Sequence, residues 1–395
     1  MSSIIWSHGK TWIDVRSYAK KILKEFGYGK VKIMGQSLLD SANQLVDGIK
    51  MELLDSTDGF FSVESHKFSI HVMNVLWSLV GGYKFDSNDI LLKRNMECVD
   101  KAFDIIGHRN LYNMFPFLKN WFPKQVNYPQ HLELHREIHD FTKILINDAR
   151  ERRSQRLDSD PISFIEEFLD KIEEHEQDTK TIFTQEQLEI ILEDLFFGGL
   201  ETTGTFLTWS ILYLVQNLDV QTKFRKEVLA KMKDRTDLLQ TIDLKKIPYV
   251  KATVLEILRM GNVVPTPLPR CATQDIEIKE FTIPKGTILF YNLHALYNDK
   301  KYWNDPETFM PERFIDEKGE IDAIKSERIL STVFGMGPRV CFGEAVAIDS
   351  LFMFLAALIL NFKFEIIPGC EPSAKDPVCG LCVCPRKFKV KVSSV

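Results

Sequence analysis

Apolar residues recur three and four positions apart over most of the first two thirds of the chain, which places them on one face of a helix. This spacing predicts amphipathic helices over residues 12–26, 34–55, 62–80 and 129–153. Residues 185–216 are apolar nearly all round in their second half, which predicts a buried helix. After residue 262 prolines become frequent and short alternating segments follow, so strands are expected. The pattern predicts an α+β protein, mainly α with a smaller β part.

Three further segments extend this picture. Residues 110–126 are aromatic and contain Pro116 and Pro123, so a loop or short helices are expected there, facing a membrane, covering a ligand or packed on the core. The charged segment 166–180 predicts a helix end followed by a surface loop. The longest apolar run, residues 351–360, is shorter than the roughly 18 residues that span a bilayer, which predicts a core helix.

The composition narrows the class of protein. The chain has 395 residues, of which 45% are hydrophobic and 27% charged, which allows a large globular core. Its formal net charge of −5 argues against a nucleic-acid partner. Seven cysteines, with no targeting pattern in the first residues, predict reduced thiols in a protein that faces the cytosol.

The most informative stretch is FGMGPRVCFGEA, residues 334–345, with Cys341 near its centre. A thiol just before a helix start meets the positive end of the helix dipole and unpaired N–H groups, so we expect a lowered pKa for Cys341. The surrounding glycines let the backbone approach a large flat group, and Arg339 supplies a cation for an acidic one. A buried structural cysteine is the simpler alternative. A thiolate, a glycine floor and an arginine together suit the edge of a haem.

The spacing favours the haem interpretation. Five positions match the pattern F-x-x-G-x-R-x-C-x-G, namely Phe334, Gly337, Arg339, Cys341 and Gly343. The chain thereby resembles the cytochrome P-450 superfamily, the haem-thiolate monooxygenases. The resemblance implies that Cys341 is the axial thiolate ligand of haem b iron and that the other four positions bind or shape the cofactor.

The segment 12–26 carries a second part of this resemblance. Trp12 and Arg16 lie one turn apart on one helix face, where an ordinary aromatic–cation surface pair is the simpler interpretation. The resemblance implies that both side chains lie at a haem propionate. Three lysines on the other faces are a solvated surface or, as our hypothesis, help to dock an electron-donating reductase: Lys20, Lys21 and Lys24.

The sequence GGLETT lies inside the predicted buried helix 185–216. Gly198 and Gly199 each cost about 1 kcal/mol relative to alanine, which either close helix packing or a ligand groove would offset. A threonine here can bond back to the carbonyl four residues earlier and bend the helix. The resemblance implies that both glycines flank the oxygen site and that Thr202, with Glu201, delivers protons to dioxygen.

Other positions take their roles from the resemblance. Glu256 and Arg259 form a weak E-x-x-R signal, and their apolar neighbours suggest a buried pair that needs another partner. The resemblance implies that Arg313 completes a Glu–Arg–Arg cluster near the cysteine turn. It also implies that Arg270 binds a haem propionate. The implied substrate pocket contains Phe197, Val264, Leu268 and Gly380, the last in a hairpin turn.

Two groups of residues have metal-like spacing. A histidine face and a cysteine-rich tail are the candidates: His131, His135 and His139, and Cys370, Cys379, Cys382 and Cys384. A structural zinc site usually pairs two C-x-x-C segments, and only one is present. The histidines are flanked by charged residues, which favours a solvated face.

The resemblance covers nearly the whole chain as one domain, residues 1–395. We divide it into a helix-rich part (1–262), strands and a meander (263–340), the cysteine turn with its helix (341–362) and a β hairpin tail (363–395). Relative to the family pattern we expect the membrane anchor, the first helices and part of the first sheet to be absent. The full-length form is expected at the cytosolic face of the endoplasmic reticulum membrane.

The implied reaction inserts one atom of O2 into an apolar substrate of the xenobiotic, steroid or lipid class. Electrons would come from NADPH through a reductase. One alternative is a truncated, catalytically incompetent chain that binds haem weakly or serves only as an interaction partner. Another is a member that rearranges oxygenated substrates without a reductase, against which the Glu201–Thr202 pair argues.

Overall fold

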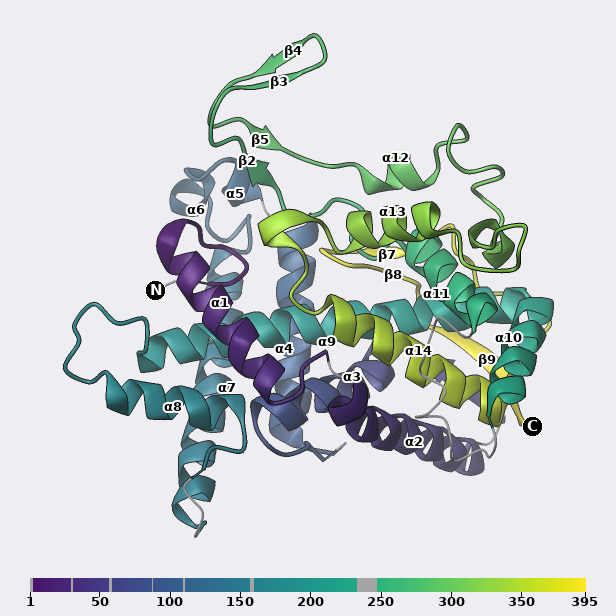
Figure 1. The fold of residues 1–395 in the computed structure, drawn as a ribbon, viewed down its shortest axis with the longest axis horizontal. Coiled ribbons are helices and arrows are strands. Elements are labelled where there is room, and N and C mark those ends of the chain that lie inside the picture. The colour runs from purple at the N-terminus through teal and green to yellow at the C-terminus, as the bar shows by residue number, and fades with distance from the viewer. Residues whose placement is uncertain are drawn as a thin grey trace.

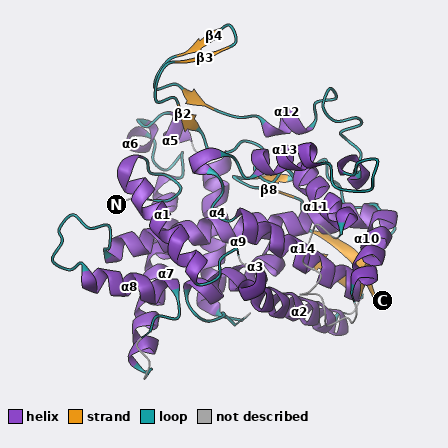
Figure 2. Cartoon of the chain, in the orientation of Figure 1, coloured by secondary structure: helices purple, strands orange, loops and turns teal. Residues whose placement is uncertain are grey.

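The computed structural model describes residues 3–29, 31–56, 59–86, 88–108, 111–156, 160–232 and 247–395. Helices dominate the described chain, and its strands are short and pair antiparallel (Figures 1 and 2). The prediction of a mainly α protein with a smaller β part is therefore confirmed. The longer helices are α1 (Gly9–Glu25), α2 (Val31–Asp55), α3 (Ser65–Val80), α4 (Ile90–His108), α7 (Tyr128–Ser154), α8 (Phe164–Glu174), α9 (Gln185–Gln216), α10 (Leu218–Lys231), α11 (Pro248–Gly261), α13 (Ala323–Val333) and α14 (Glu344–Asn361).

The remaining elements are short. The short helices are α5 (Leu111–Met114), α6 (Leu118–Trp121), α12 (Leu293–Tyr297), η3 (Pro311–Phe314) and η4 (Gly337–Arg339). The strands are β1 (Phe60–Val63), β2 (Arg270–Cys271), β3 (Ile276–Ile278), β4 (Phe281–Ile283), β5 (Ile288–Leu289), β6 (Phe362–Glu365), β7 (Val378–Cys379), β8 (Val383–Cys384) and β9 (Phe388–Ser394). The short helices α5 and α6 confirm the short helices expected in residues 110–126, of which residue 110 lies outside the described residues.

Helix α9 crosses the centre of the molecule and packs on α3, α7, α11 and α14 (Figure 1). It begins where the side chain of Thr184 accepts a hydrogen bond from the backbone N–H of Gln187 at 3.1 Å, an ordinary N-cap. Its approach to α3 depends on Gly204, because a Cβ there would lie 2.2 Å from the side-chain oxygen of Ser69. Glycine at this position lets the two helices pack closely.

The three-stranded sheet has the order β1-β9-β6 and joins distant parts of the chain. Phe61 of β1 pairs with Val390 of β9, and Phe364 of β6 pairs with Val392. The prediction of a helix from residue 62 was therefore wrong at its start, because residues 60–63 form β1 and the helix begins only at Ser65. Residues 60–63 form a strand because β9 provides their hydrogen-bonding partner, and the local sequence does not reveal that partner.

Helix α14 is long and apolar enough to cross a membrane by length and composition, but 67% of it is buried inside the protein. The helix starts at Glu344, so it includes residues before the apolar run 351–360. Its place in the core is confirmed. The helix lies against α2, α9 and α10, so it carries the cysteine turn at its N-terminal end onto the central helix.

Candidate haem site

The cysteine turn is a closed loop between α13 and α14. The backbone N–H of Cys341 donates to the carbonyl of Phe334 at 2.6 Å, which closes the loop at the residue that ends α13. Gly335 and Gly337 have φ values of +78° and +74°, a region that side chains with a Cβ rarely adopt. Gly343 is the N-cap of α14, and a Cβ there would lie 4.0 Å from the sulfur of Cys341. The glycines thus shape the loop and keep the thiol uncovered on one side.

Burial raises the pKa of the Cys341 thiol above its ordinary value. The N–H groups of Gly343 and Glu344 and the cation of Arg16 oppose this effect, but the carboxylate of Glu344 adds to it. The prediction that the turn alone lowers the thiol pKa was therefore wrong, because desolvation outweighs the helix terminus. Cys341 still has exposed surface. A thiolate at this position needs a bound metal cation, which deprotonates a coordinating thiol outright.

Helix α1 lies against this turn. The guanidinium of Arg339 lies 3.6 Å from the centre of the Trp12 ring, and the guanidinium of Arg16 lies 5.5 Å from the centre of the Phe342 ring. Arg16 donates a hydrogen bond to the carbonyl of Val340, and the indole N–H of Trp12 donates to the carbonyl of Ile4 at 3.1 Å. The structure thus brings Trp12 and Arg16 to the cysteine turn.

Three guanidinium groups gather around the turn without an acidic partner. Burial, together with repulsion from Arg270 and Arg16, lowers the pKa of Arg339. In the described part of the chain, no Asp or Glu carboxylate forms an ion pair with any of these three arginines. Arg270 comes from β2, far along the chain from α1. Three mutually repelling cations form a site that favours an anionic ligand.

The two glycines of GGLETT have different surroundings. Gly198 is exposed although α9 is buried on most sides, and a Cβ there would meet nothing within 4 Å. A Cβ on Gly199 would lie 3.0 Å from Leu76 of α3, so Gly199 serves helix packing. Successive residues face about 100° apart on a helix, so Gly199 and Gly198 have different neighbours. A place for Gly199 beside the oxygen site stays a prediction. Only Gly198 opens the helix face.

Thr202 lies on the same open face of α9 as Gly198. Its hydroxyl donates to the carbonyl of Gly198 at 2.8 Å, which confirms the predicted bond to the preceding turn. The side chain of Glu201 points elsewhere and makes hydrogen bonds with Asp100 of α4 and with Thr205. Burial, reinforced by Asp100, raises the pKa of Glu201.

Two of the four predicted pocket residues, Phe197 and Gly380, lie beside Phe103 of α4. Phe197 is buried, and its ring stacks on the Phe103 ring with centres 5.3 Å apart. Gly380 lies at the tip of the β7–β8 hairpin, and the adjacent N–H of Leu381 donates to the carbonyl of Phe103 at 3.2 Å. Val264 and Leu268 are half-buried in the extended segment after α11. The same hairpin contacts this segment, since the N–H of Val383 donates to the carbonyl of Val263 at 2.8 Å.

Glu256, Arg259 and Arg313 form a closed, buried cluster. The two guanidine nitrogens of Arg259 lie 2.7 and 2.8 Å from the Glu256 carboxylate, and Arg313 lies 2.9 Å from it. The fourth contact of this carboxylate is the N–H of Met310 at 3.0 Å. Carbonyls accept the remaining guanidine hydrogens: Tyr297 from Arg259, and Asn304, Asp305 and Thr308 from Arg313. The cluster ties α11 to η3 and to the loop before it.

The histidine face is not a solvated face. The rings of His131 and His135 lie 4.4 Å apart, and His135 stacks on Phe197, so the expectation was wrong for these two. Burial lowers the pKa of His131 to about 4. His139 bonds to the carboxylates of Glu193 and Glu189 at 2.6 and 3.3 Å. Among the described residues, no three His, Cys, Asp or Glu side chains lie close enough together to hold a metal ion.

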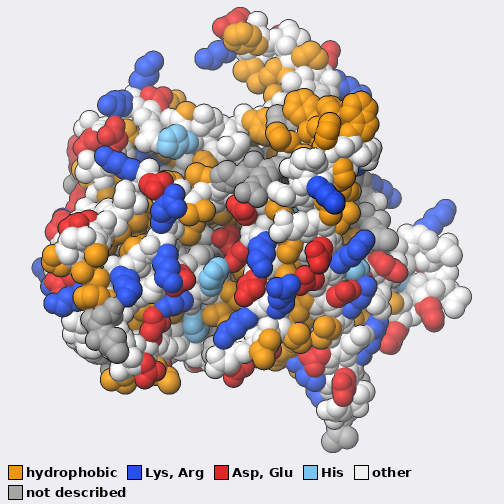
Figure 3. All heavy atoms as spheres, turned by 180° about the vertical axis from the view of Figure 1, so that it is seen from behind, with side chains coloured by type: hydrophobic (Ala, Val, Ile, Leu, Met, Phe, Trp, Pro, Cys, Tyr) orange, Lys and Arg blue, Asp and Glu red, His pale blue; other side chains and the backbone are white. Residues whose placement is uncertain are grey.

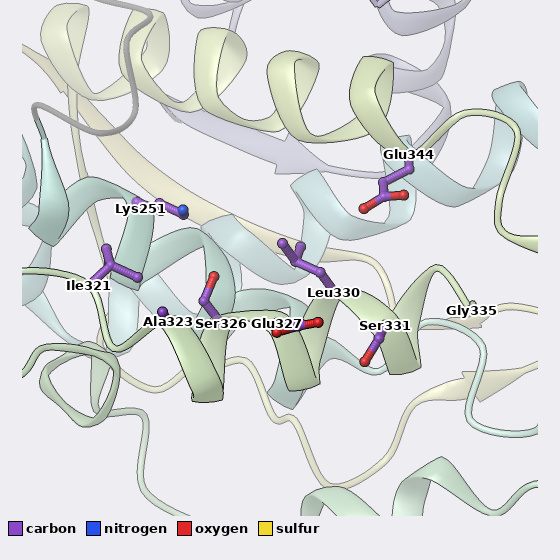
Figure 4. Close-up of a pocket in the computed structure, with 9 residues that line it drawn as sticks. All are labelled: Lys251, Ile321, Ala323, Ser326, Glu327, Leu330, Ser331, Gly335 and Glu344. Atoms are coloured by element: carbon purple, nitrogen blue, oxygen red, sulfur yellow. The ribbon is translucent and has the colours of Figure 1, made fainter. Parts of the chain in front are cut away.

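An open cavity of about 490 Å³ lies on the other side of the cysteine turn, between α11, α13 and α14 (Figure 4). It is lined by Lys251, Ile321, Ala323, Ser326, Glu327, Leu330, Ser331, Gly335 and Glu344. Two of these lining residues, Gly335 and Glu344, belong to the cysteine turn. None of the lining residues is one that the sequence motifs assign to the haem or to oxygen chemistry. This cavity is therefore separate from the face that Gly198 opens.

Sequence reasoning missed Tyr28, His66 and Asp100. The hydroxyl of Tyr28 donates to the carbonyl of Phe342 at 3.2 Å and so braces the cysteine turn from the end of α1. Asp100 contacts both His66 and Glu201. No local motif marks these residues, because Tyr28 lies in the turn after α1, His66 in α3 and Asp100 in α4.

The residues present fit a haem. Cys341 supplies a thiol, Gly198 and Gly337 leave open space where a Cβ would stand, and three guanidiniums lack carboxylate partners in the described chain. A flat dianionic macrocycle that carries a thiophilic metal satisfies all three features. Arg16 and Arg339 are held beside the thiol by their contacts to the turn and to Trp12.

Comparison with known proteins agrees with this geometry. A family model described as Cytochrome P450 matches residues 2–392. The chain is 30% identical to "Farnesoate epoxidase" of Bombyx mori over 98% of this chain and 75% of the relative. It is 32% identical to "Cytochrome P450 2J3" of Rattus norvegicus, over 92% and 70%, and 30% identical to "Cytochrome P450 2U1" of Mus musculus, over 99% and 71%. The chain therefore belongs to the cytochrome P450 family of haem-dependent monooxygenases, an oxidoreductase.

Proposed function

We propose that this chain inserts one atom of O2 into a small apolar substrate, with electrons from NADPH delivered by a partner reductase. The observation that carries the proposal is the convergence of the Cys341 turn with three arginines that lack acidic partners in the described chain. Half-buried cations that repel one another and have no counter-charge destabilise a fold, so core packing does not explain this arrangement. An anionic macrocycle would relieve the repulsion among these cations, and this relief would add to its binding free energy.

In this proposal Cys341 ligates the iron of haem b, and the haem supplies the chemistry that activates dioxygen. Arg16, Arg270 and Arg339 bind its carboxylates. Trp12 holds the Arg339 guanidinium over its ring and fixes its direction. The other positions of the pattern, Phe334, Gly337 and Gly343, close the turn and leave space for the macrocycle.

The proposal gives Thr202 and Glu201 the task of moving protons. The Thr202 hydroxyl lies on the open face of α9 and already donates to the Gly198 carbonyl, so its oxygen can accept a hydrogen bond from the opposite side. Glu201 holds a proton at neutral pH, because burial and Asp100 both raise its pKa. A protonated carboxyl one residue from the hydroxyl is a proton donor for oxygen chemistry.

The proposed substrate is apolar, of the lipid, steroid or xenobiotic class. Phe197 and Phe103 form a stacked aromatic wall, and Val264 and Leu268 add aliphatic surface. The name of the Bombyx mori relative refers to farnesoate, which supports an apolar substrate without identifying the one used here.

The proposal places the enzyme at the endoplasmic reticulum membrane. Five large apolar side chains are exposed on α5, α6 and the turns beside them: Leu111, Phe115, Phe117, Trp121 and Phe122. Figure 3 shows hydrophobic side chains gathered over this part of the surface, near the β3–β4 hairpin. Exposed aromatic clusters of this kind suit a membrane interface.

A spectroscopic experiment tests the proposal. The purified protein, supplied with hemin, reduced and exposed to carbon monoxide, is expected to show the red-shifted Soret band of thiolate ligation. Cys341→Ala should abolish the band, whereas Cys271→Ala, which changes another exposed thiol, should keep it. An unchanged band in Cys341→Ala contradicts the ligand assignment. Product formation with NADPH and a reductase then separates a working monooxygenase from a protein that only binds haem.

A further inference from the structure

Three titratable side chains from three different helices form a line from the surface to the centre of α9. His66 lies at the start of α3, Asp100 in α4 and Glu201 in the GGLETT segment. The His66 side chain is 60% exposed and the Asp100 side chain 22% exposed. The ring Nδ1 of His66 lies 2.9 Å from Oδ2 of Asp100, and the second contact of Asp100 is with the Glu201 carboxyl.

The contact between Asp100 and Glu201 requires a proton. Oδ1 of Asp100 is buried and has no donor among the protein groups that form hydrogen bonds in the structure. Two ionised carboxylates only accept hydrogen bonds, so they repel each other when close. One proton held between the two carboxyl groups gives Oδ1 its missing donor. Because Oδ2 faces His66, this proton lies on the side of Glu201.

We propose that His66, Asp100 and Glu201 form the path by which protons from solvent reach the Thr202–Glu201 pair. A proton from water enters at the exposed His66 ring, and the ring passes the proton on Nδ1 to Oδ2 of Asp100. Asp100 then returns a proton to Glu201 after Glu201 has given one up. Each cycle takes up one proton at the surface and delivers one at Glu201, with no electron transferred by the three residues. This inference rests on the proposed function.

The electrostatic surroundings give the path a direction. Asp100, with contributions from Glu64 and Glu97, raises the pKa of His66, so the ring holds a proton readily. His66 and Lys101 lower the pKa of Asp100, which stays ionised, while burial and Asp100 raise the pKa of Glu201. The other groups facing Glu201 are the hydroxyl of Thr205 and the thiols of Cys382 and Cys384 on the β7–β8 hairpin, whose own pKa values are raised. Glu201 is therefore protonated in the resting protein. After Glu201 donates this proton, a proton from His66 replaces it through Asp100.

The competing explanation is that these contacts only fasten α3, α4 and α9 together. A fastening role predicts loss of stability but no change in the fate of reduced oxygen. A proton path predicts a change in the fate of reduced oxygen but little loss of stability. When protons arrive slowly, electrons from NADPH leave as hydrogen peroxide instead of producing product and water. Added hydrogen peroxide brings its own protons and electrons, so it bypasses the path.

The test compares His66→Gln and Asp100→Asn with His294→Gln, an exposed histidine on α12 that serves as the matched control. In the reconstituted haem protein with reductase and NADPH, we expect about a hundredfold less product per NADPH in Asp100→Asn, the low end of what a positioned proton donor contributes. His66→Gln should lose less and should show its loss mainly at high pH, where direct exchange with water is slow. Both variants should recover the activity of the control when hydrogen peroxide replaces reductase and NADPH.

A second readout does not depend on turnover. Infrared spectra of the resting protein should show the band of a protonated buried carboxyl, absent in Glu201→Gln and in Asp100→Asn, where the new amide stabilises ionised Glu201. Histidine NMR should show a lower pKa for His66 in Asp100→Asn than in the wild type, because the neighbouring carboxylate is lost. If both path variants match His294→Gln in peroxide release and product, the inference is wrong.

The two proposals fail in distinguishable ways. A wild-type protein that binds haem but forms no product contradicts the proposed function. In that case the infrared band still decides the inference, because a resting protein without a protonated carboxyl at Glu201 has no proton to pass on. A band that persists in Asp100→Asn would equally contradict the shared proton.

Discussion

Two groups of arginines in this protein have opposite environments. Arg259 and Arg313 are buried with Glu256 and have backbone carbonyls for their other hydrogens, so every charge has a partner. Arg16 and Arg339 lie beside Cys341, form hydrogen bonds to carbonyls, and have no carboxylate partner in the described chain. The closed group ties structural elements together, whereas the open group contains no negative charge to balance its cations. The binding site can therefore be recognised as the place where arginines have no carboxylate partner in the described chain.

The largest effect should come from breaking the closed group. Glu256→Gln leaves two guanidiniums buried with no counter-charge, and we expect the free energy of unfolding to fall by about 3–5 kcal/mol. Urea denaturation measures it. The control, Glu312→Gln, removes an exposed partner of Lys223 and should cost about 1 kcal/mol or less. Equal losses in the two variants would mean that burial of the cluster contributes nothing.

Breaking the open group should affect binding rather than folding. Arg339→Ala removes one unpaired cation, and a hydrogen bond to a charged group contributes about 1.5–3 kcal/mol, so we expect hemin to bind roughly ten- to a hundredfold more weakly. Stability of the haem-free protein should change little, because repulsion among the arginines is relieved. Hemin titration followed by absorbance measures the affinity.

A matched variant sharpens this comparison. Arg328 of α13 also lies over an aromatic ring, with its guanidinium 4.7 Å from the centre of Tyr302. Arg328→Ala should leave hemin affinity unchanged. Equal weakening in Arg328→Ala and Arg339→Ala would show that the open group has no special part in binding.

A buried carboxyl without a cation provides an intermediate case. Asp194 of α9 accepts hydrogen bonds from Ser3 and Ile4, and burial raises its pKa from 3.8 to about 6. The folded state therefore binds this proton more tightly than the unfolded state does. Its stabilising effect is fully present below pH 3.8 and is lost as the pH rises through about 6. Asp194→Asn should remove a decline of about 3 kcal/mol over this window.

The measurement is the difference in unfolding free energy between wild type and Asp194→Asn across the pH range. This difference should be flat above pH 6 and should change only between pH 3.8 and 6. A difference that is constant over the whole range would contradict the raised pKa.

The smallest effect should come from the exposed lysines of α1, which lie on the helix that holds Trp12 and Arg16. Charge reversal of Lys20, Lys21 and Lys24 should slow reduction by the proposed reductase about tenfold at low salt and less at high salt, since steering charges are screened. Hemin content should not change. Stopped-flow reduction under carbon monoxide measures the rate. The matched control reverses three exposed lysines elsewhere, Lys279, Lys285 and Lys318, and an equal slowing there would point to net charge alone.

Contiguous motifs predicted their own local geometry well. The cysteine turn closes as expected because its glycines adopt positive φ and the bond from Cys341 to Phe334 spans only seven residues. The bond from Thr202 to Gly198 was predictable for the same reason, since four residues make one helical turn. Short-range sterics and hydrogen bonds determine such features before any distant segment is in place.

Predictions from the sequence were absent or wrong for features that depend on distant segments of the chain. The pKa of Cys341 is raised because the folded chain buries the thiol, and no local sequence pattern predicts this burial. The start of α3 was wrong because β1 has β9 as its partner, and residues 60–63 reveal their strand only beside it. The two glycines of GGLETT looked alike in sequence, and only the position of Leu76 separated Gly199 from Gly198.

By itself the sequence determined that this protein has a haem-type cysteine turn, a buried glycine-containing helix and a mainly helical fold. These depend on residue type and spacing within single segments. The tertiary structure alone decided which charges are paired, because pairing is a property of surfaces that meet. It placed Arg16, Arg270 and Arg339 together without acidic partners in the described chain, and it joined His66 and Asp100 to Glu201. Both assemblies draw on helices and strands far apart in the chain, so only packing could assemble them.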